Sequence, residues 1–150
     1  MKNLVCLSLI SGFMLIQADI AAQTDSIRLI CPFENGSGRE PEEAYTWDPP
    51  EKKIIMITGN DTIIRSCANA RVSNVNPTED NRYEVVIYYK DYYFWYYGVG
   101  KPFVKRGDTV KAGQPLGLYT PGTEVEFRMF KNEDAIDPRN LLDCRNPKTN

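Results

Sequence analysis

The segment "GTEVEF" (122–127) places two glutamates, Glu124 and Glu126, one residue apart in a stretch that has the composition of a β-strand. Residues i and i+2 of a strand point to the same face, which predicts that both carboxylates share one face and that Val125 and Phe127 face the core. Neighbouring carboxylates repel each other, so such a pair is expected where a ligand, a metal ion or a partner uses it.

The sequence contains no histidine, which restricts the chemistry open to this pair. Zinc hydrolases bind their metal largely through neutral imidazoles, which keep it electrophilic. Two carboxylates can cleave a glycosidic bond when they stand roughly 5–9.5 Å apart across the substrate, and i, i+2 neighbours with parallel aim lie at the low end of that range.

The first residues, "MKNLVCLSLISGFMLIQADIAAQ", are typical of a secretory signal peptide. Lys2 is followed by an apolar run over 4–16 and by the small pair Ala21-Ala22, which predicts a signal peptide over 1–22. A membrane anchor is the alternative, and Asp19 interrupts the run. We expect an exported protein, periplasmic or secreted, without stable membrane insertion after cleavage.

The formal net charge of −2 is close to neutral, and loss of residues 1–22 removes one charge of each sign. Nucleic acid and acidic membrane surfaces attract strongly basic chains, so neither is expected as a partner.

Three cysteines lie beyond the signal peptide: Cys31, Cys67 and Cys144. An exported chain is expected to form a disulfide, and the pair 31–144 would join the two ends of the domain. The pairings 31–67 and 67–144 remain open. We expect Cys67 to be buried and unreactive, since no histidine is present to activate it.

Short strand-like runs predict an all-β domain: a small β-sandwich or barrel-sandwich hybrid of antiparallel strands with a long N-terminal loop. A short strand is expected at 27–31, then a loop, and a hairpin is expected around Lys90-Asp91. "TEVEFRMF" is expected to be the last strand, before one helical turn in "DPRNLL" (137–142). The strand-like runs are 53–59, 61–75, 82–98, 108–120 and 123–130.

The aromatic run at 88–97 has two interpretations. Alternation puts Tyr93 and Trp95 on one face of a strand and Phe94 and Tyr96 on the other. Exposed rings on a sheet can hold sugars or bases, whereas aromatic residues also simply pack well in strands. We expect at least one of the two faces to be core.

The segment "VKRGDTVKAGQPLG" (104–117) is the most specific motif. Gly107 and Gly113 permit tight turns between apolar residues. This pattern resembles both the lipoyl/biotinyl carrier domains and the lysostaphin-type, or LytM-like, zinc endopeptidases of peptidoglycan. A carrier needs a modified lysine at a hairpin tip, and the nearest candidate, "EKKIIM" (51–56), lacks the flanking pattern.

The endopeptidase resemblance covers residues 61–142 in four blocks whose order and spacing are kept. Besides 104–117, these are "DTIIRSCANARVSNV" (61–75), "YEVVIYYKDYYFWYYGVG" (83–100) and "PGTEVEFRMFKNEDAIDPRNLL" (121–142). The resemblance implies one β domain over 61–145, preceded by a strand and loop region (23–60) that belongs to it and followed by a tail (146–150).

The resemblance also implies which positions formed the site. Glu124 and Glu126 stand at the family's HxH pair, and Gly98 stands at a catalytic histidine. Asp48, with Ala44 four residues earlier, is the nearest match to the HxxxD ligand pair. A site of Asp48, Glu124 and Glu126 would be all oxygen, which suits calcium or magnesium better than zinc.

A non-catalytic domain on the endopeptidase scaffold is therefore expected, with no metal and no cofactor. The former active-site groove, with Trp95 or Tyr96 at its border, would bind a peptidoglycan fragment or an envelope protein. An acidic groove would favour a cationic partner. The alternatives are an interaction protein with a vestigial groove and a hydrolase with a carboxylate-bound metal.

Overall fold

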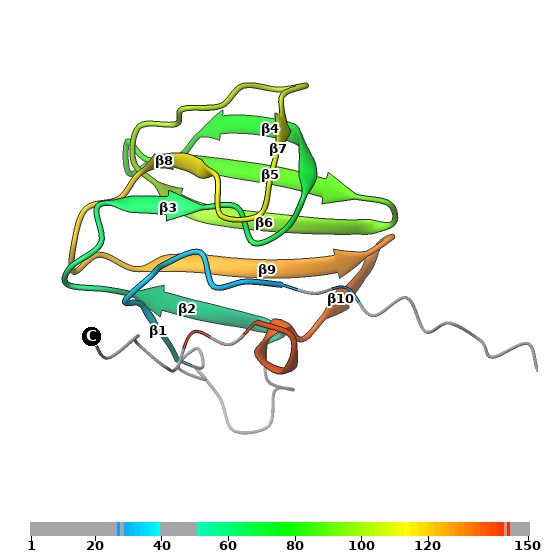
Figure 1. Cartoon of the computed structure of the whole chain (residues 1–150), viewed down its shortest axis with the longest axis horizontal. Coiled ribbons are helices and arrows are strands. Elements are labelled where there is room, and N and C mark those ends of the chain that lie inside the picture. The colour runs from blue at the N-terminus through cyan, green and yellow to red at the C-terminus, as the bar shows by residue number, and fades with distance from the viewer. Residues whose placement is uncertain (1–26, 28, 40–50, 143, 145–150) are drawn as a thin grey trace, which may run out of the picture.

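The computed structural model describes residues 27, 29–39, 51–142 and 144 (Figure 1). Within these residues the chain is built almost entirely of antiparallel strands, which confirms the all-β expectation. The elements are β1 (Ser37–Arg39), β2 (Lys53–Ile57), β3 (Ile63–Arg65), β4 (Ala70–Pro77), β5 (Tyr83–Tyr89), β6 (Tyr92–Val99), β7 (Thr109–Val110), β8 (Pro115–Leu118), β9 (Val125–Lys131), β10 (Asp134–Ile136) and a 3-10 turn, η1 (Pro138–Asn140).

Two sheets contain all the strands of the described residues. The larger sheet has eight strands in the order β1-β2-β9-β6-β5-β4-β7, and β10 pairs with β9 beside this path. The smaller sheet is the antiparallel pair β3–β8. Figure 1 shows β9 running between β2 and β6, so the C-terminal third of the chain supplies a central strand.

Strict alternation along β6 and β9 divides the large sheet into two faces. Val125 and Phe127 are completely buried, as the sequence predicts, and so are Phe94 and Tyr96. Ile64 of β3 and Leu116 of β8 belong to the same buried cluster, so the small sheet packs against this face. The opposite face carries Trp95, Tyr97, Glu126 and Arg128.

The hairpin expected around Lys90-Asp91 is present as β5–β6, with Tyr89 opposite Tyr92. Lys90 takes a positive φ of 52° in its two-residue turn. Gly107 (φ 93°) and Gly113 (φ 83°) also adopt the left-handed conformation that glycine favours, as expected for turns around β7. The final helical turn forms at η1, where Asp137 accepts a hydrogen bond from the backbone N–H of Arg139.

Two strand predictions are wrong. Residues 27 and 29–31 form no strand; instead the backbone N–H of Ile30 donates to the carbonyl of Cys67 (2.9 Å). The first strand of the described residues is β1, within the predicted loop. The strand at β9 is not the last, because the chain turns at Asn132 (φ 53°) and β10 pairs back on it. The first correction reflects pairing of β1 with β2, about 20 residues further along the chain, which local composition does not specify. The second is a short hairpin between β9 and β10.

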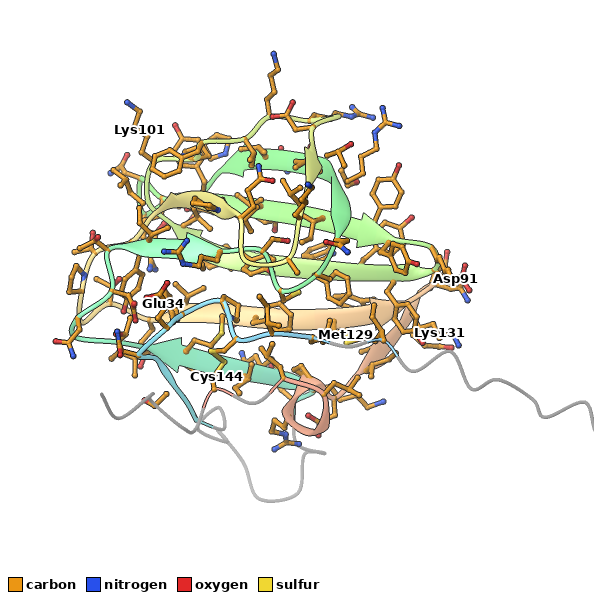
Figure 2. The ribbon with its side chains drawn as sticks, viewed as in Figure 1. Glu34, Asp91, Lys101, Met129, Lys131 and Cys144 are labelled. Atoms are coloured by element: carbon orange, nitrogen blue, oxygen red, sulfur yellow. A yellow bond between two sulfur atoms is a disulfide. The ribbon has the colours of Figure 1, made fainter. Side chains whose placement is uncertain are left out.

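The disulfide joins Cys31 to Cys144, the preferred pairing of the three, across 113 residues of sequence. Cys144 lies in the buried cluster near Met56 (Figure 2). Cys67 is buried as expected, and burial raises the pKa of its thiol to about 12. At neutral pH this thiol is therefore protonated and a poor nucleophile.

Candidate functional site

A pocket of about 370 Å³ lies on the face of the large sheet opposite the buried cluster. Its walls come from three adjacent strands, because the sheet places alternate residues of β5, β6 and β9 side by side. Tyr97 stands opposite both Glu84 and Glu126, and Trp95 stands opposite Arg128. The lining residues are Glu84, Trp95, Tyr97, Glu126, Arg128 and Phe130.

Aromatic rings supply the apolar part of the pocket. Trp95 is 37% exposed and Tyr97 is 41% exposed, although both belong to a central strand. The Trp95 ring packs against Phe130 of β9 with ring centroids 5.4 Å apart and planes tilted by 52°. This contact holds the indole in a defined orientation, since tilted aromatic pairs are favourable.

Glu126 forms two ion pairs, one through each carboxylate oxygen. Its Oε1 accepts from Nε of Arg128 (2.5 Å), and its Oε2 lies 3.0 Å from Nζ of Lys53 on β2. Burial opposes ionisation of Glu126, but the hydrogen bonds from Arg128 and Lys53 outweigh it and hold the pKa of this carboxyl below its ordinary value. Lys53 also pairs with Glu51, which does not line the pocket.

The surroundings of Glu126 offer few metal ligands. Ile55 is the residue opposite Glu126 on β2, so the cross-strand neighbour of Glu126 on that side is apolar. Among the described residues, no group of three or more histidine, cysteine, aspartate or glutamate side chains is arranged to hold a metal ion. Glu126 therefore belongs to an ion-pair cluster, Lys53–Glu126–Arg128, in which each of its carboxylate oxygens contacts a cation.

Gly98 lies at a bulge in β6 with a φ of 107°. A Cβ atom at this position would lie 2.7 Å from Nη1 of Arg82 and 2.9 Å from the carbonyl oxygen of Glu124. The guanidinium of Arg82 therefore occupies the space that a side chain at residue 98 would need. Positive φ and close approach both require glycine here.

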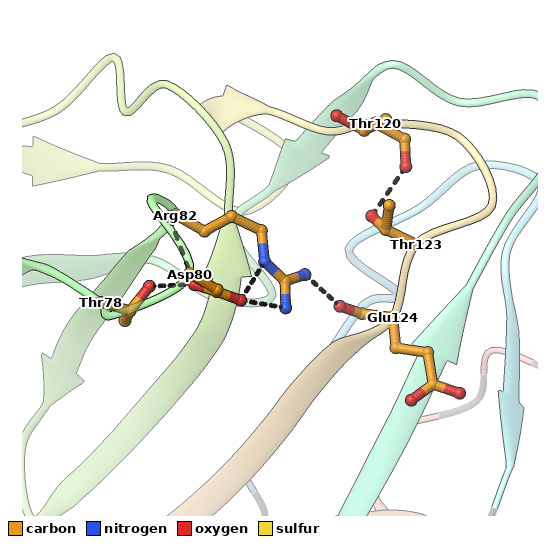
Figure 3. A network of polar contacts seen from close by, with 6 residues as sticks. All are labelled: Thr78, Asp80, Arg82, Thr120, Thr123 and Glu124. Carbon is orange, nitrogen blue, oxygen red and sulfur yellow. Dashed lines mark hydrogen bonds and ion pairs between the residues drawn. The ribbon is translucent and has the colours of Figure 1, made fainter.

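A polar network fixes Arg82 in this place (Figure 3). Asp80 accepts from the hydroxyl of Thr78 (2.5 Å) and from Nε of Arg82 (2.7 Å), and Nη1 of Arg82 donates to the backbone carbonyl of Glu124 (2.7 Å). The hydrogen bond from Thr78 and those from Arg82 lower the pKa of Asp80 to about 2. Figure 3 shows the carboxylate of Glu124 pointing away from the guanidinium.

The structure separates the candidate residues into groups. Glu126 and Trp95 line the pocket, whereas Gly98 and Glu124 lie together beside Arg82 and do not line it. Tyr96 cannot border a groove, because it is completely buried and its hydroxyl accepts from the backbone N–H of Cys67 (2.8 Å). Asp48 lies outside the described residues.

Sequence reasoning missed the partners that neutralise the site. Lys53 and Arg128 compensate Glu126, so the acidic groove expected from the two glutamates is wrong as a description of this pocket. The "EFR" spacing of Glu126 and Arg128 on one face could have indicated the second pair. Arg82 gave no local signal, since its contact with Glu124 spans 42 residues.

Solved structures with the same fold identify the architecture. Csd3 from Helicobacter pylori superposes with a TM-score of 0.66 at 20% identity over 78% of this chain and 33% of Csd3. The SpoIIQ–SpoIIIAH pore forming complex matches with a TM-score of 0.62 at 19% identity, over 80% of this chain and 94% of the matched one. The catalytic domain of lysostaphin from Staphylococcus simulans matches with a TM-score of 0.53 at 21% identity, over 69% of this chain and 86% of the lysostaphin chain.

This chain has the fold of the lysostaphin-type, or LytM-like, endopeptidase domains. The resemblance seen in the sequence is thus confirmed at the level of the fold. The chain spans about a third of the length of Csd3. No protein-family model matches the sequence, and no curated protein matches it significantly. In the part of the chain that is described, no helix is long and apolar enough to cross a membrane.

Proposed function

We propose that this protein is a non-catalytic LytM-like domain of the cell envelope, exported with residues 1–22 as its signal peptide. It binds peptidoglycan, or a protein that acts on peptidoglycan, through the pocket on the open face of the large sheet. The observation that carries this proposal is the Lys53–Glu126–Arg128 cluster. It stands where the sequence resemblance places a zinc ligand of the family.

The chemistry of that cluster argues against metal-dependent hydrolysis. A zinc site that activates water needs neutral nitrogen donors, and the sequence has no histidine. Both oxygens of Glu126 already face a cation, so a metal ion would have to displace Arg128 and Lys53 to reach them. Arg82 takes the space beside Gly98, where the resemblance places a catalytic histidine.

The pocket itself favours binding over a vestigial groove. It has a volume within the range of small-molecule sites, exposed rings and several polar groups that converge on it. A filled groove would show neither the cavity nor the exposed indole of Trp95.

Co-sedimentation with purified sacculi tests the proposal. The intact protein is expected to pellet with sacculi, and Trp95→Ala is expected to reduce the bound fraction strongly. Phe103→Ala is the matched control, because Phe103 is also an exposed ring (50%) but does not line the pocket.

A parallel assay on the same preparations addresses the two alternatives. We expect no release of soluble wall fragments with or without added zinc, magnesium or calcium. Metal-dependent release would replace the proposal with a hydrolase. Absence of binding both to sacculi and to purified wall hydrolases would rule out the proposed function.

A further inference from the structure

We propose that the pocket holds a pyranose ring of the glycan strand, stacked on the indole of Trp95, and that it does not read the peptide stems. The inference rests on the proposed function and names the ligand class within it. The carrying observation is that the pocket joins a fixed aromatic platform to the Glu126–Arg128 ion pair and to the further acceptor Glu84.

The aromatic platform matches the apolar face of a sugar. One side of a pyranose ring presents C–H groups, which pack on aromatic rings, while its hydroxyls lie around the edge and need polar partners. Phe130 of the adjacent strand packs against the indole of Trp95 at a centroid distance of 5.4 Å and holds its orientation. Tyr97 extends the platform by one position along the same strand face.

The polar groups of the pocket suit hydroxyl and amide groups better than free ions. The charge of Glu126 is offset by Arg128 within the pocket and by Lys53 beside it, a lysine that also pairs with Glu51. Glu126 is held in two ion pairs, so its carboxylate and the Arg128 guanidinium are ordered hydrogen-bonding groups with little net field. A peptide stem carries free carboxylate and ammonium groups, which would have to break these pairs.

Glu84 provides the remaining acceptor. Within the described residues its side chain is contacted by the Asn76 amide, at 3.4 Å, and by no cationic group. It stands opposite Tyr97 and lines the pocket. A carboxylate in this position can accept hydrogen bonds from two sugar hydroxyls.

The test is NMR titration of the intact protein with two separate probes: an oligomer of β-1,4-linked N-acetylglucosamine without peptide, and a free wall peptide stem without sugar. The glycan is expected to shift the resonance of the Trp95 indole N–H, which is assigned by its loss in Trp95→Phe. The backbone amide resonance of Phe103 is expected to stay unchanged. Trp95→Ala is expected to weaken glycan affinity about tenfold. Phe103→Ala is expected to retain it.

The outcomes separate the inference from the function on which it rests. Binding of the peptide stem but not of the glycan overturns the inference and keeps the proposed function. Glycan binding that shifts residues away from the pocket, or that Trp95→Ala leaves unchanged, also overturns it. Failure to bind glycan, stem, sacculi and wall hydrolases alike removes the proposed function as well. If Trp95→Ala does not fold, the chemical-shift changes of the unaltered protein on glycan addition test the inference, according to whether they fall on the pocket residues.

Discussion

At the scale of single residues, charge compensation is the main feature of this site. Glu126 is a carboxylate that two cations have already satisfied, and each of these cations comes from a different position in the sheet. Because the carboxylate is only part-buried, the solvent screens these pairs and each contributes modestly to stability. Their role is to order the pocket.

The substitution Glu126→Gln tests this view through the pH dependence of stability. The pKa of Glu126 is below its ordinary value of 4.5, so its contribution is present above that pH and is lost as the pH falls. We expect Glu126→Gln to lower the free energy of unfolding by about 1 kcal/mol at about pH 7 and to matter little at about pH 3. Urea denaturation at both pH values measures the difference; an equal loss at both would contradict the ion-pair account.

Gly98 is the second residue whose type the surroundings dictate. We expect Gly98→Ala to lower the free energy of unfolding by about 1–3 kcal/mol, because the alanine would combine a strained φ of 107° with contacts to Arg82 and Glu124. Gly59→Ala is the control, since a Cβ there meets nothing within 4 Å and the backbone is unstrained. Chemical denaturation measures the free energy of unfolding of both variants. A similar loss in Gly98→Ala and Gly59→Ala would show that position 98 tolerates a side chain.

At the scale of elements, the alternation of side chains along β6 decides which aromatic residues are buried in the core and which are exposed on the pocket side. The core interpretation of the aromatic run is confirmed for one face, and the ligand-binding interpretation stays a prediction for the other. Phe94 and Tyr96 are completely buried against the small sheet, whereas Trp95 and Tyr97 are exposed on the pocket side. A one-residue change of register would exchange these roles.

Neighbouring substitutions in β6 should therefore have opposite consequences. We expect Phe94→Ala to cost about 3–5 kcal/mol of unfolding free energy, because it leaves a cavity beside Phe127. Trp95→Ala should cost far less stability and should weaken glycan binding about tenfold. Thermal unfolding followed by circular dichroism distinguishes them, and a larger loss for Trp95→Ala would contradict the assignment of faces.

At the scale of the whole molecule, the disulfide links the first described segment to the last. Cys31 and Cys144 are 113 residues apart in sequence, with Cα atoms 5.2 Å apart. Residues 27 and 29–31 form no strand, and this covalent link adds to the backbone hydrogen bonds at Ile30 and Pro32 and to the burial of Phe33 in attaching the segment to the domain.

Removing the link should lower stability without changing the fold. We expect Cys31→Ser with Cys144→Ser to reduce the free energy of unfolding by roughly 2–5 kcal/mol, through the entropy that the unfolded chain regains. A reductant should lower the free energy of unfolding of the unaltered protein by a similar amount and should leave that of the double variant unchanged. Sensitivity of the double variant to reductant would point instead to Cys67.

The sequence by itself determined the all-β class, the β5–β6 hairpin, the inward aim of Val125 and Phe127, and the preferred cysteine pair. These features depend on local alternation, turn residues and cysteine placement, all of which can be read over short stretches. The sequence likewise shows that no imidazole is available as a metal ligand in this chain.

Only the tertiary structure decided the character of the site. It brought Lys53 and Arg128 to Glu126, placed Arg82 over Gly98, buried Tyr96 and left Trp95 exposed. The physical reason is that these contacts join strands far apart in the chain, and the charge of a pocket is the sum over all strands that meet there. Two glutamates read alone indicate an acidic groove, whereas the sheet places cations beside one of them.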